Sequence, residues 1–335
     1  MLKTRTLRIA LFILALAALA SVHALAAPKT YLAVVTGSTG GTYYPVGTIF
    51  ATLWNNQLGA SLGVQASAQS SGGTAENLNM LKQGEAEMAI AMTNLAWFSY
   101  SGTEMYQGKA NPNLRMITGL WPDVTQYVVA VSSKIDSIAD LKGKRFCTGA
   151  VGSGTEYSSK AINRIIGGLS DKDYKAEHLG YFESSAAMQN GQLDGFNAEG
   201  GVPTSAVSEI FASATAVKLL EFSDAEYKKL SAEVPFYVKY VILANTYKGQ
   251  AKDINTIGVK CALIGTSKLS DELVYNLTKT IYENLAQVKS SHKALEYMTM
   301  QRSVEGLPPI PLHPGAVKFY QEKGIAIPAN LLPAK

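Results

Sequence analysis

The strongest constraint on the fold is an alternation of short apolar runs with helical patterns. Tyr31–Thr36, Val64–Gln69 and Met88–Met92 are strand-like runs, and apolar positions recur at helical spacing between them. Further strand-like runs follow at Ile117–Trp121, Tyr127–Val131, Arg145–Thr148 and Leu193–Ala198. This order is typical of β-α units that build a largely parallel sheet, so we expect an α/β fold.

Loops rich in Gly, Ser and Thr follow the expected strands and open helices. They are Gly37–Thr42, Ser70–Thr74, Gly152–Thr155 and Glu199–Gly201. Glycine lets the backbone approach a ligand, and N–H groups at a helix start attract anions. Since ligands of open α/β sheets bind beyond the carboxyl ends of strands, these loops predict a polar ligand cleft.

Ordinary helix capping is the alternative interpretation of each loop taken alone. Ser153 and Glu156 match the S-x-x-E capping box, which favours a structural role for Glu156. Thr93 and Asn94 end the third strand and are expected to form the floor of the cleft. Tyr43 lies at a helix entry, where it could line the cleft or simply pack. The candidate ligand-binding residues are Ser38, Gly40, Thr42, Tyr43, Gly73, Thr74, Thr93, Asn94, Ser153, Gly154, Thr155, Glu199 and Gly201.

Two segments repeat one layout. In residues 82–91 and in residues 189–198, a helix ends near a glycine, and an acidic residue precedes an apolar strand. Coincidence is the alternative, because glycine commonly ends helices. If the repeat is genuine, it predicts two lobes of similar architecture.

The N-terminus has the organisation of a secretory signal peptide. Lys3, Arg5 and Arg8 precede the apolar run Ile9–Ala20, and Ala24–Ala26 forms an A-x-A cleavage site. The apolar run is shorter than the roughly 20 residues that a spanning helix needs, although an uncleaved anchor is the alternative. We expect cleavage of residues 1–26 and a location in a bacterial periplasm.

Net charge argues against a nucleic-acid partner. The chain has 30 Lys and Arg residues and 26 Asp and Glu residues, and removal of the signal peptide leaves 27 basic residues. The remaining length suits about two domains. We expect lobe I to comprise 27–122 plus 243–335 and lobe II 123–242, with chain crossings near 122–125 and 240–244.

Cysteine and histidine usage gives no sign of catalysis. Cys147 and Cys261 lie in apolar runs, where two buried thiols are expected in different lobes, with a disulfide as the alternative. The histidines after residue 26 have no metal-ligand spacing, and the G-x-S-x-G and P-loop motifs are not found. We therefore expect no cofactor, no metal and no enzymatic activity.

At these loops the sequence resembles the TAXI family of solute-binding proteins, the extracytoplasmic receptors of one class of TRAP transporters. The matching stretches are 36–47, 71–78, 138–145, 152–156, 273–279 and 310–316. The resemblance implies a type II periplasmic-binding fold, in which two α/β lobes close over a ligand. It also implies a sodium-driven membrane permease as partner, ligands such as glutamate or 2-oxoglutarate, and no single arginine that clamps the ligand.

The sequence departs from this family at two strand ends. Met92–Leu95 replaces a stretch that usually reads Val-Gln-Ser-Asp, and Glu199 stands where the family has a small, neutral strand end. A carboxylate in the cleft would repel the second carboxylate of a ligand but could pair with a ligand amine. A solvent-facing or helix-capping Glu199 is the alternative.

The expected function is therefore that of a monomeric solute-binding receptor. An enzyme on the same fold and the sensing domain of a signalling system are the competing classes. A TRAP permease gene beside this one would favour the receptor.

Overall fold

The elements alternate as expected along residues 28–333, which are the residues that the computed structural model describes. The signal-peptide prediction lies outside these residues. The strands are β1 (Thr30–Val35), β2 (Val64–Gln69), β3 (Met88–Met92), β4 (Leu114–Ala130), β5 (Arg145–Cys147), β6 (Lys175–Glu177), β7 (Gly195–Gly200), β8 (Val217–Leu219), β9 (Tyr237–Ile242) and β10 (Ile254–Thr266). The α-helices are α2 (Tyr43–Leu62), α3 (Thr74–Gln83), α4 (Thr93–Ser101), α5 (Gly154–Ile165), α6 (Tyr181–Gln189), α7 (Ser205–Ala212), α8 (Asp224–Glu233), α9 (Asp271–Glu283), α10 (Leu285–Ser291) and α11 (Pro314–Glu322).

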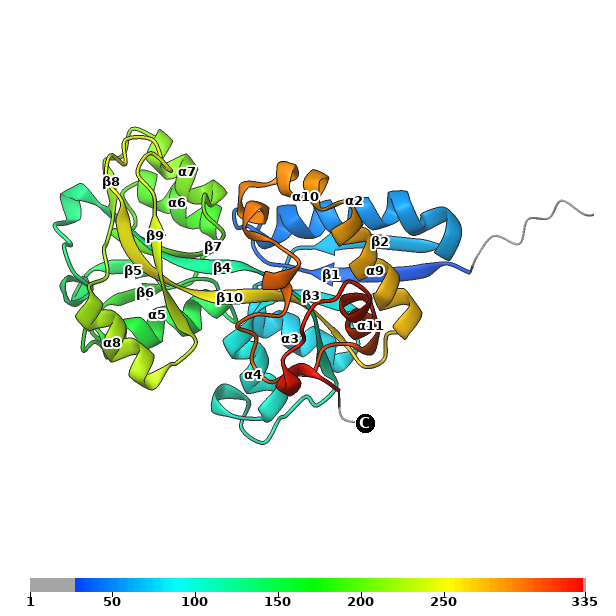
Figure 1. Ribbon diagram of the computed structural model, residues 1–335. Helices are drawn as coiled ribbons and strands as arrows, with labels where there is room; N and C mark the ends of the chain where they lie inside the picture. The colour runs from blue at the N-terminus through cyan, green and yellow to red at the C-terminus, as the bar shows by residue number, and fades with distance from the viewer. Residues whose placement is uncertain (1–27, 334–335) are drawn as a thin grey trace, which may run out of the picture.

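One sheet runs through two lobes, in the order β2-β1-β3-β10-β4-β7-β5-β6. In the first lobe β1 pairs in parallel with β2 and β3, and in the second lobe β5 pairs in parallel with β6 and β7. The long strands β4 and β10 are antiparallel to each other and pass between the lobes (Figure 1). The lobes thus repeat one strand order, β2-β1-β3-β10 and β6-β5-β7-β4.

The repeated segments have equivalent structural roles in the two lobes. Glu87, just before β3, accepts a hydrogen bond of 2.7 Å from the backbone N–H of Ala33. Asp194, just before β7, accepts one of 2.8 Å from the backbone N–H of Arg145. Ala33 and Arg145 each precede the first residue of their strand that pairs with β3 or β7. The acidic residue therefore joins equivalent parallel strands in both lobes.

Each lobe has its own apolar core. The first-lobe cluster draws on buried residues from Leu32 to Trp121 and from Cys261 to Leu331. Two second-lobe clusters draw on residues from Val124 to Val259, and Met92 joins one of them. All five residues of β3 are buried, as is typical of a parallel strand covered on both faces.

The chain crosses between lobes in β4 and β10. Residues 117–121 and 127–131 were expected as two strands, but residues 114–130 form one strand that continues through Pro122. Pro122 is tolerated because it lies opposite Lys260, next to a register shift that interrupts the β4–β10 ladder. Residues 240–244, where the second crossing was expected, lie at the end of β9, which pairs with residues 254–259 of β10.

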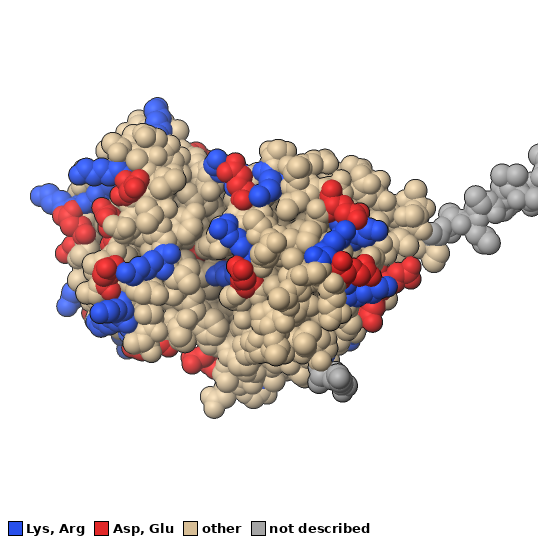
Figure 2. All heavy atoms as spheres, viewed as in Figure 1, with Lys and Arg blue, Asp and Glu red and all other residues tan. Residues whose placement is uncertain are grey.

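The charges on the surface and the state of the two cysteines both agree with the expectations from the sequence. Figure 2 shows basic and acidic side chains interspersed on both lobes, without a large patch of one sign on this face. Cys147 and Cys261 are both buried and unpaired, as expected. Within residues 28–333, no helix is both long and apolar enough to span a membrane.

Candidate functional site

A small cavity lies between the two lobes, where loops from both of them meet. Its volume is about 480 Å³, including space that is open to solvent. This volume suits a small polar molecule. The lining residues are Gly37, Ser38, Gly41, Thr42, Tyr43, Gly72, Gly73, Thr74, Met92, Asp123, Ala150, Ser153, Gly154, Thr155, Gly180, Tyr181 and Glu199.

Equivalent loops of the two lobes form the cavity. In the first lobe the loops after β1 and β2 contribute Gly37–Tyr43 and Gly72–Thr74. In the second lobe the loops after β5 and β6 contribute Ala150–Thr155 and Gly180–Tyr181. The cavity therefore lies beyond the carboxyl ends of parallel strands, as is usual for ligand sites in open α/β sheets.

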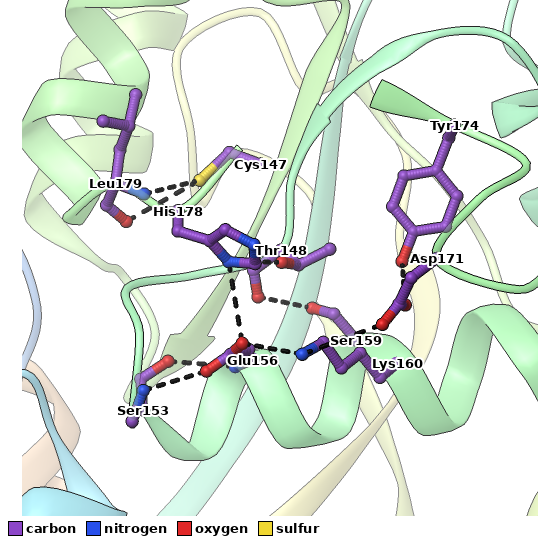
Figure 3. Close-up of polar contacts among 11 residues, drawn as sticks. Cys147, Thr148, Ser153, Glu156, Ser159, Lys160, Asp171, Tyr174, His178 and Leu179 are labelled. Carbon is purple, nitrogen blue, oxygen red and sulfur yellow. Dashed lines mark hydrogen bonds and ion pairs between the residues drawn. The ribbon is translucent and has the colours of Figure 1, made fainter. Parts of the chain in front are cut away.

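The start of α5 is held in place by a group of polar contacts (Figure 3). Ser153 caps the helix by accepting a hydrogen bond of 2.9 Å from the N–H of Glu156, and Glu156 accepts one of 2.9 Å from the N–H of Gly152. Lys160 donates to Glu156 at 2.7 Å, and His178 Nδ1 lies 3.7 Å from the same carboxylate. Burial opposes ionisation, but the bonds from Lys160 and Gly152 hold the pKa of Glu156 below its usual range. Glu156 thus fixes the loop and does not line the cavity.

Direct contacts between the lobes close both sides of the cavity. On one side Ala75 and Glu76, at the start of α3, donate backbone hydrogen bonds of 3.1 and 3.3 Å to the carbonyl of Gly152. On the other side the N–H of Ala206 donates to the carbonyl of Gly40 at 3.2 Å. A ligand therefore enters or leaves when these contacts separate. The contact with Gly152 also occupies two N–H groups of α3 that were expected to attract an anion.

Asp123 is a buried acid of the cavity that the sequence analysis did not identify as a ligand residue. It lies on β4 and is 1% exposed. The hydroxyl of Tyr43 donates to Oδ2, and the indole N–H of Trp121 donates to Oδ1 at 3.1 Å. Burial raises the pKa of Asp123 to about 7, although both hydrogen bonds lower it.

Glu199 is the second buried acid, and it lies on the same side of the sheet. It is 6% exposed, and its Oε1 accepts a hydrogen bond of 2.7 Å from the hydroxyl of Thr125. Its Oε2 is buried and has no hydrogen-bond partner among the residues that the structure describes. Burial raises the pKa of Glu199 to about 8, the bond from Thr125 lowers it, and the charge of Asp123 raises it.

Tyr181 connects the loops of the second lobe to β7. Its hydroxyl donates a hydrogen bond of 2.8 Å to the carbonyl of Glu199 and accepts one of 2.9 Å from the N–H of the same residue. The same hydroxyl lies 2.5 Å from Thr155 Oγ1. Tyr181 therefore fixes both the strand end that carries Glu199 and the start of α5.

Most of the candidate ligand residues line this one cavity. These are Ser38, Thr42, Tyr43, Gly73, Thr74, Ser153, Gly154, Thr155 and Glu199. Four candidates are not among the lining residues, because their surroundings are already filled. Thr93 donates to the carbonyl of Lys260 at 2.8 Å, and the Asn94 side chain accepts from the N–H of Leu95 at 2.8 Å. Gly40 packs on Phe182, and Gly201 packs against Trp121 and Ala294.

Asp123, Gly180 and Tyr181 line the cavity but were missed. Asp123 follows Pro122 and was placed between two expected strands, so it was not considered as a ligand residue. Gly180 precedes α6 in the same way that Gly73 precedes α3, so comparison of the repeated units could have located it.

Two α/β lobes that share the crossing strands β4 and β10, with a cavity between them, have the type II periplasmic-binding fold. Residues 34–324 match the NMT1-like family, and the chain belongs to this family. The solved structure of a protein from Bordetella bronchiseptica RB50 is similar, with a TM-score of 0.51. The alignment covers 89% of this chain and 90% of the Bordetella chain, and the two sequences are 15% identical. The alkanesulfonate-binding protein SsuA from Xanthomonas axonopodis pv. citri, bound to MOPS, is 15% identical over 88% of this chain and 85% of its own, with a TM-score of 0.48. A putative L-cystine ABC transporter from Listeria monocytogenes is 15% identical over 80% and 97%, with a TM-score of 0.49.

Proposed function

We propose that the protein is an extracytoplasmic solute-binding receptor that captures a small carboxylate or amino acid and delivers it to a membrane transporter. The supporting observation is the interlobe cavity, because its lining comes from equivalent loops of two lobes that, within residues 28–333, are connected by the two crossing strands β4 and β10. Such an arrangement allows a ligand to bind in the open form and to be enclosed on closure. The signal-peptide pattern of residues 1–26 supports export to the periplasm.

Two kinds of membrane transporter are candidates for the partner. The TAXI-like stretches favour a TRAP permease, which is driven by sodium. By contrast, the solved structures similar in fold include SsuA and a putative L-cystine ABC transporter. Uptake of a confirmed ligand into vesicles that carry the permease encoded beside this gene separates the two. Dependence on a sodium gradient supports a TRAP permease, and dependence on ATP supports an ABC transporter.

A thermal-shift screen tests the receptor function itself. A ligand that binds only the folded state stabilises it by about 2.7 kcal/mol at a concentration of 100 times Kd. The purified protein without residues 1–26 is screened with amino acids, amines, mono- and dicarboxylates and neutral sugars. A rise in Tm of several degrees with one of these classes is expected. If no compound raises Tm and titration calorimetry detects no binding, the receptor proposal is wrong.

A further inference from the structure

The two acids of the cavity lie next to each other on one face of the sheet. Glu199 on β7 pairs with Thr125 on β4 in an antiparallel ladder. Asp123 lies two residues before Thr125, so it points to the same face as Thr125. Residues on such a diagonal of a sheet have Cβ atoms about 7 Å apart, within reach of one small ligand group.

Neutral groups alone bind these acids. Tyr43 and Trp121 donate to Asp123, and Thr125 donates to Glu199. Among the described residues that line the cavity there is no Lys, Arg or His. A buried ionised carboxylate without a cationic partner is costly, and two of them side by side are more so. The cavity therefore has a strong preference for a positively charged group beside these acids.

Two buried hydroxyl groups lie next to Glu199 outside the lining of the cavity. Ser158 Oγ and Tyr237 OH, like Glu199 Oε2, are buried without a hydrogen-bond partner among the described residues. Ser158 lies close enough to lower the pKa of Glu199, and the negative charge of Glu199 raises the pKa of Tyr237. Both hydroxyls can themselves donate to Glu199, and neither residue lines the cavity, so a ligand ammonium would approach Glu199 from the cavity side.

We propose that Asp123 and Glu199 bind the ammonium group of the ligand, so that the receptor selects small amino acids or amines and rejects carboxylates without an amine. This inference rests on the proposed receptor function and specifies its ligand class. An ammonium group carries three N–H donors and one charge, which matches two adjacent carboxylates that lack a cation.

The rest of the cavity suits the carboxylate of an amino acid. Thr42 and Tyr43 at the start of α2, and Gly154 and Thr155 at the start of α5, line the cavity from opposite lobes. The first N–H groups of a helix have no partner within the helix, and the helix dipole favours a negative group there. A single carboxylate can therefore lie between α2 and α5 while the ammonium lies at the acids. A second carboxylate at Asp123 and Glu199 would be repelled.

Titration calorimetry at pH 8 with two matched pairs of probes tests the inference. The pairs are L-alanine with pyruvate and L-glutamate with 2-oxoglutarate, which share a carbon skeleton and differ in the amine. We expect the amino acid of at least one pair to bind at least tenfold more tightly than its keto acid. Equal affinities within both pairs, tighter binding of the keto acids, or no binding of any of the four would overturn the inference.

Two substitutions and a matched control connect this selectivity to the acids. Glu199→Gln and Asp123→Asn keep the size of each side chain and remove its charge, and each is expected to weaken amino acid binding at least tenfold. Glu221→Gln makes the same charge change at an exposed position and should leave binding within twofold. Unchanged affinity in both acid variants, with wild-type thermal unfolding, would also overturn the inference. If a variant fails to fold, the comparison of probe pairs on the wild-type protein still decides.

Different experimental results would refute the proposed receptor function and the proposed ligand class. A carboxylate without an amine that raises Tm and binds as tightly as the matching amino acid refutes the ammonium site but leaves the receptor function intact. An absence of binding across every class of the thermal-shift screen refutes both.

Discussion

At the scale of single residues, Asp123 and Glu199 make the charge of the cavity depend on its occupant. Burial raises the pKa of both acids, to about 7 and about 8. Near neutral pH, at least one of the two therefore carries a proton in the unliganded protein. A cationic ligand stabilises the ionised forms, so its binding must release protons from these carboxyls.

This proton release predicts that affinity for an amino acid increases with pH. The measurement covers pH 6 to pH 8.5. At any pH below the pKa of an acid that must lose its proton, Kd should decrease by up to about tenfold for each unit that the pH is raised. A ligand that binds through carboxylates alone would show the opposite trend. Calorimetric titration of L-alanine or L-glutamate, whichever binds more tightly, in buffers of different ionisation enthalpy measures both Kd and the protons released. The slope should become smaller in Glu199→Gln, and a flat profile in the wild type would contradict the prediction.

The other titratable groups around the acids do not interfere in this range. Tyr43 and Cys261 face Asp123, and tyrosines from three elements face Glu199. Burial raises the pKa of each of these groups, so all of them stay neutral below pH 9; the tyrosines are Tyr127, Tyr181 and Tyr237. The pH dependence of binding can therefore be assigned to Asp123 and Glu199.

The sequence identified Glu199 as a candidate ligand residue but not Asp123, because the residues around the two acids form different local patterns. Glu199 ends an apolar run and precedes two glycines, which is the pattern of a strand that reaches a cleft. Asp123 follows a proline, and Pro-Asp between two apolar runs usually indicates a turn. Only pairing with β10 shows that Pro122 is accommodated beside a register shift and that Asp123 lies within a strand. That tertiary contact leaves no local signal.

At the scale of elements, the loop between β1 and α2 combines lining residues with residues that contact the other lobe. Gly37 and Ser38 line the cavity, whereas Gly40 packs directly on Phe182 of α6. A Cβ atom at Gly40 would lie 2.9 Å from the backbone nitrogen and 2.9 Å from Cγ of Phe182. Because both contacts cross the cleft, this clash exists only when the lobes are closed.

Gly40→Ala is therefore expected to impair closure without destabilising either lobe. Ligand affinity should fall about tenfold, since the closed form must shift by several tenths of an ångström against backbone atoms. The Tm of the unliganded protein should stay within about 1 °C, because an open cleft has room for the methyl group. Gly59→Ala is the control, since its Cβ would meet its nearest neighbour, the Val64 carbonyl, at 3.5 Å. A large loss of Tm in Gly40→Ala would show that the lobes are also closed without ligand.

The positions of the glycine-rich loops were predictable from the sequence. Which of their residues line the cavity and which contact the other lobe was not. Their spacing after apolar runs located the loops after β1, β2 and β5, which line the cavity. The sequence does not show that Gly152 occupies the first N–H groups of α3 or that Gly40 meets Phe182. Both are contacts between lobes, so they depend on the relative position of two bodies that are far apart in the chain.

At the scale of the whole molecule, the repeat in the sequence corresponds to two lobes with the same arrangement of strands. Glu87 and Asp194 bind equivalent backbone N–H groups, and the strand orders of the two lobes correspond. The site lies between these lobes, and both of them contribute residues to its lining. We propose that β4 and β10 act as the hinge, because they are the strands that the two lobes share.

This arrangement predicts that the ligand-free protein opens and that ligand binding compacts it. The lobes are joined by the hydrogen bonds of Gly152 and Gly40, by one from Thr42 to the Gly201 carbonyl at 2.9 Å and by one from the N–H of Tyr181 to Ser38 at 3.3 Å. Two acids without a cation in the cavity lining oppose closure around an unliganded cavity. A ligand ammonium removes that opposition and adds contacts to both lobes. Small-angle scattering should therefore show a smaller radius of gyration with a saturating concentration of the tightest-binding probe than without it. In Gly40→Ala the compaction should require more ligand in proportion to its weaker binding, whereas Gly59→Ala should follow the wild type. If the wild-type protein binds the probe tightly by calorimetry while its radius of gyration stays constant, the lobes do not close on the ligand. The cavity would then have to fill through local movement of its loops.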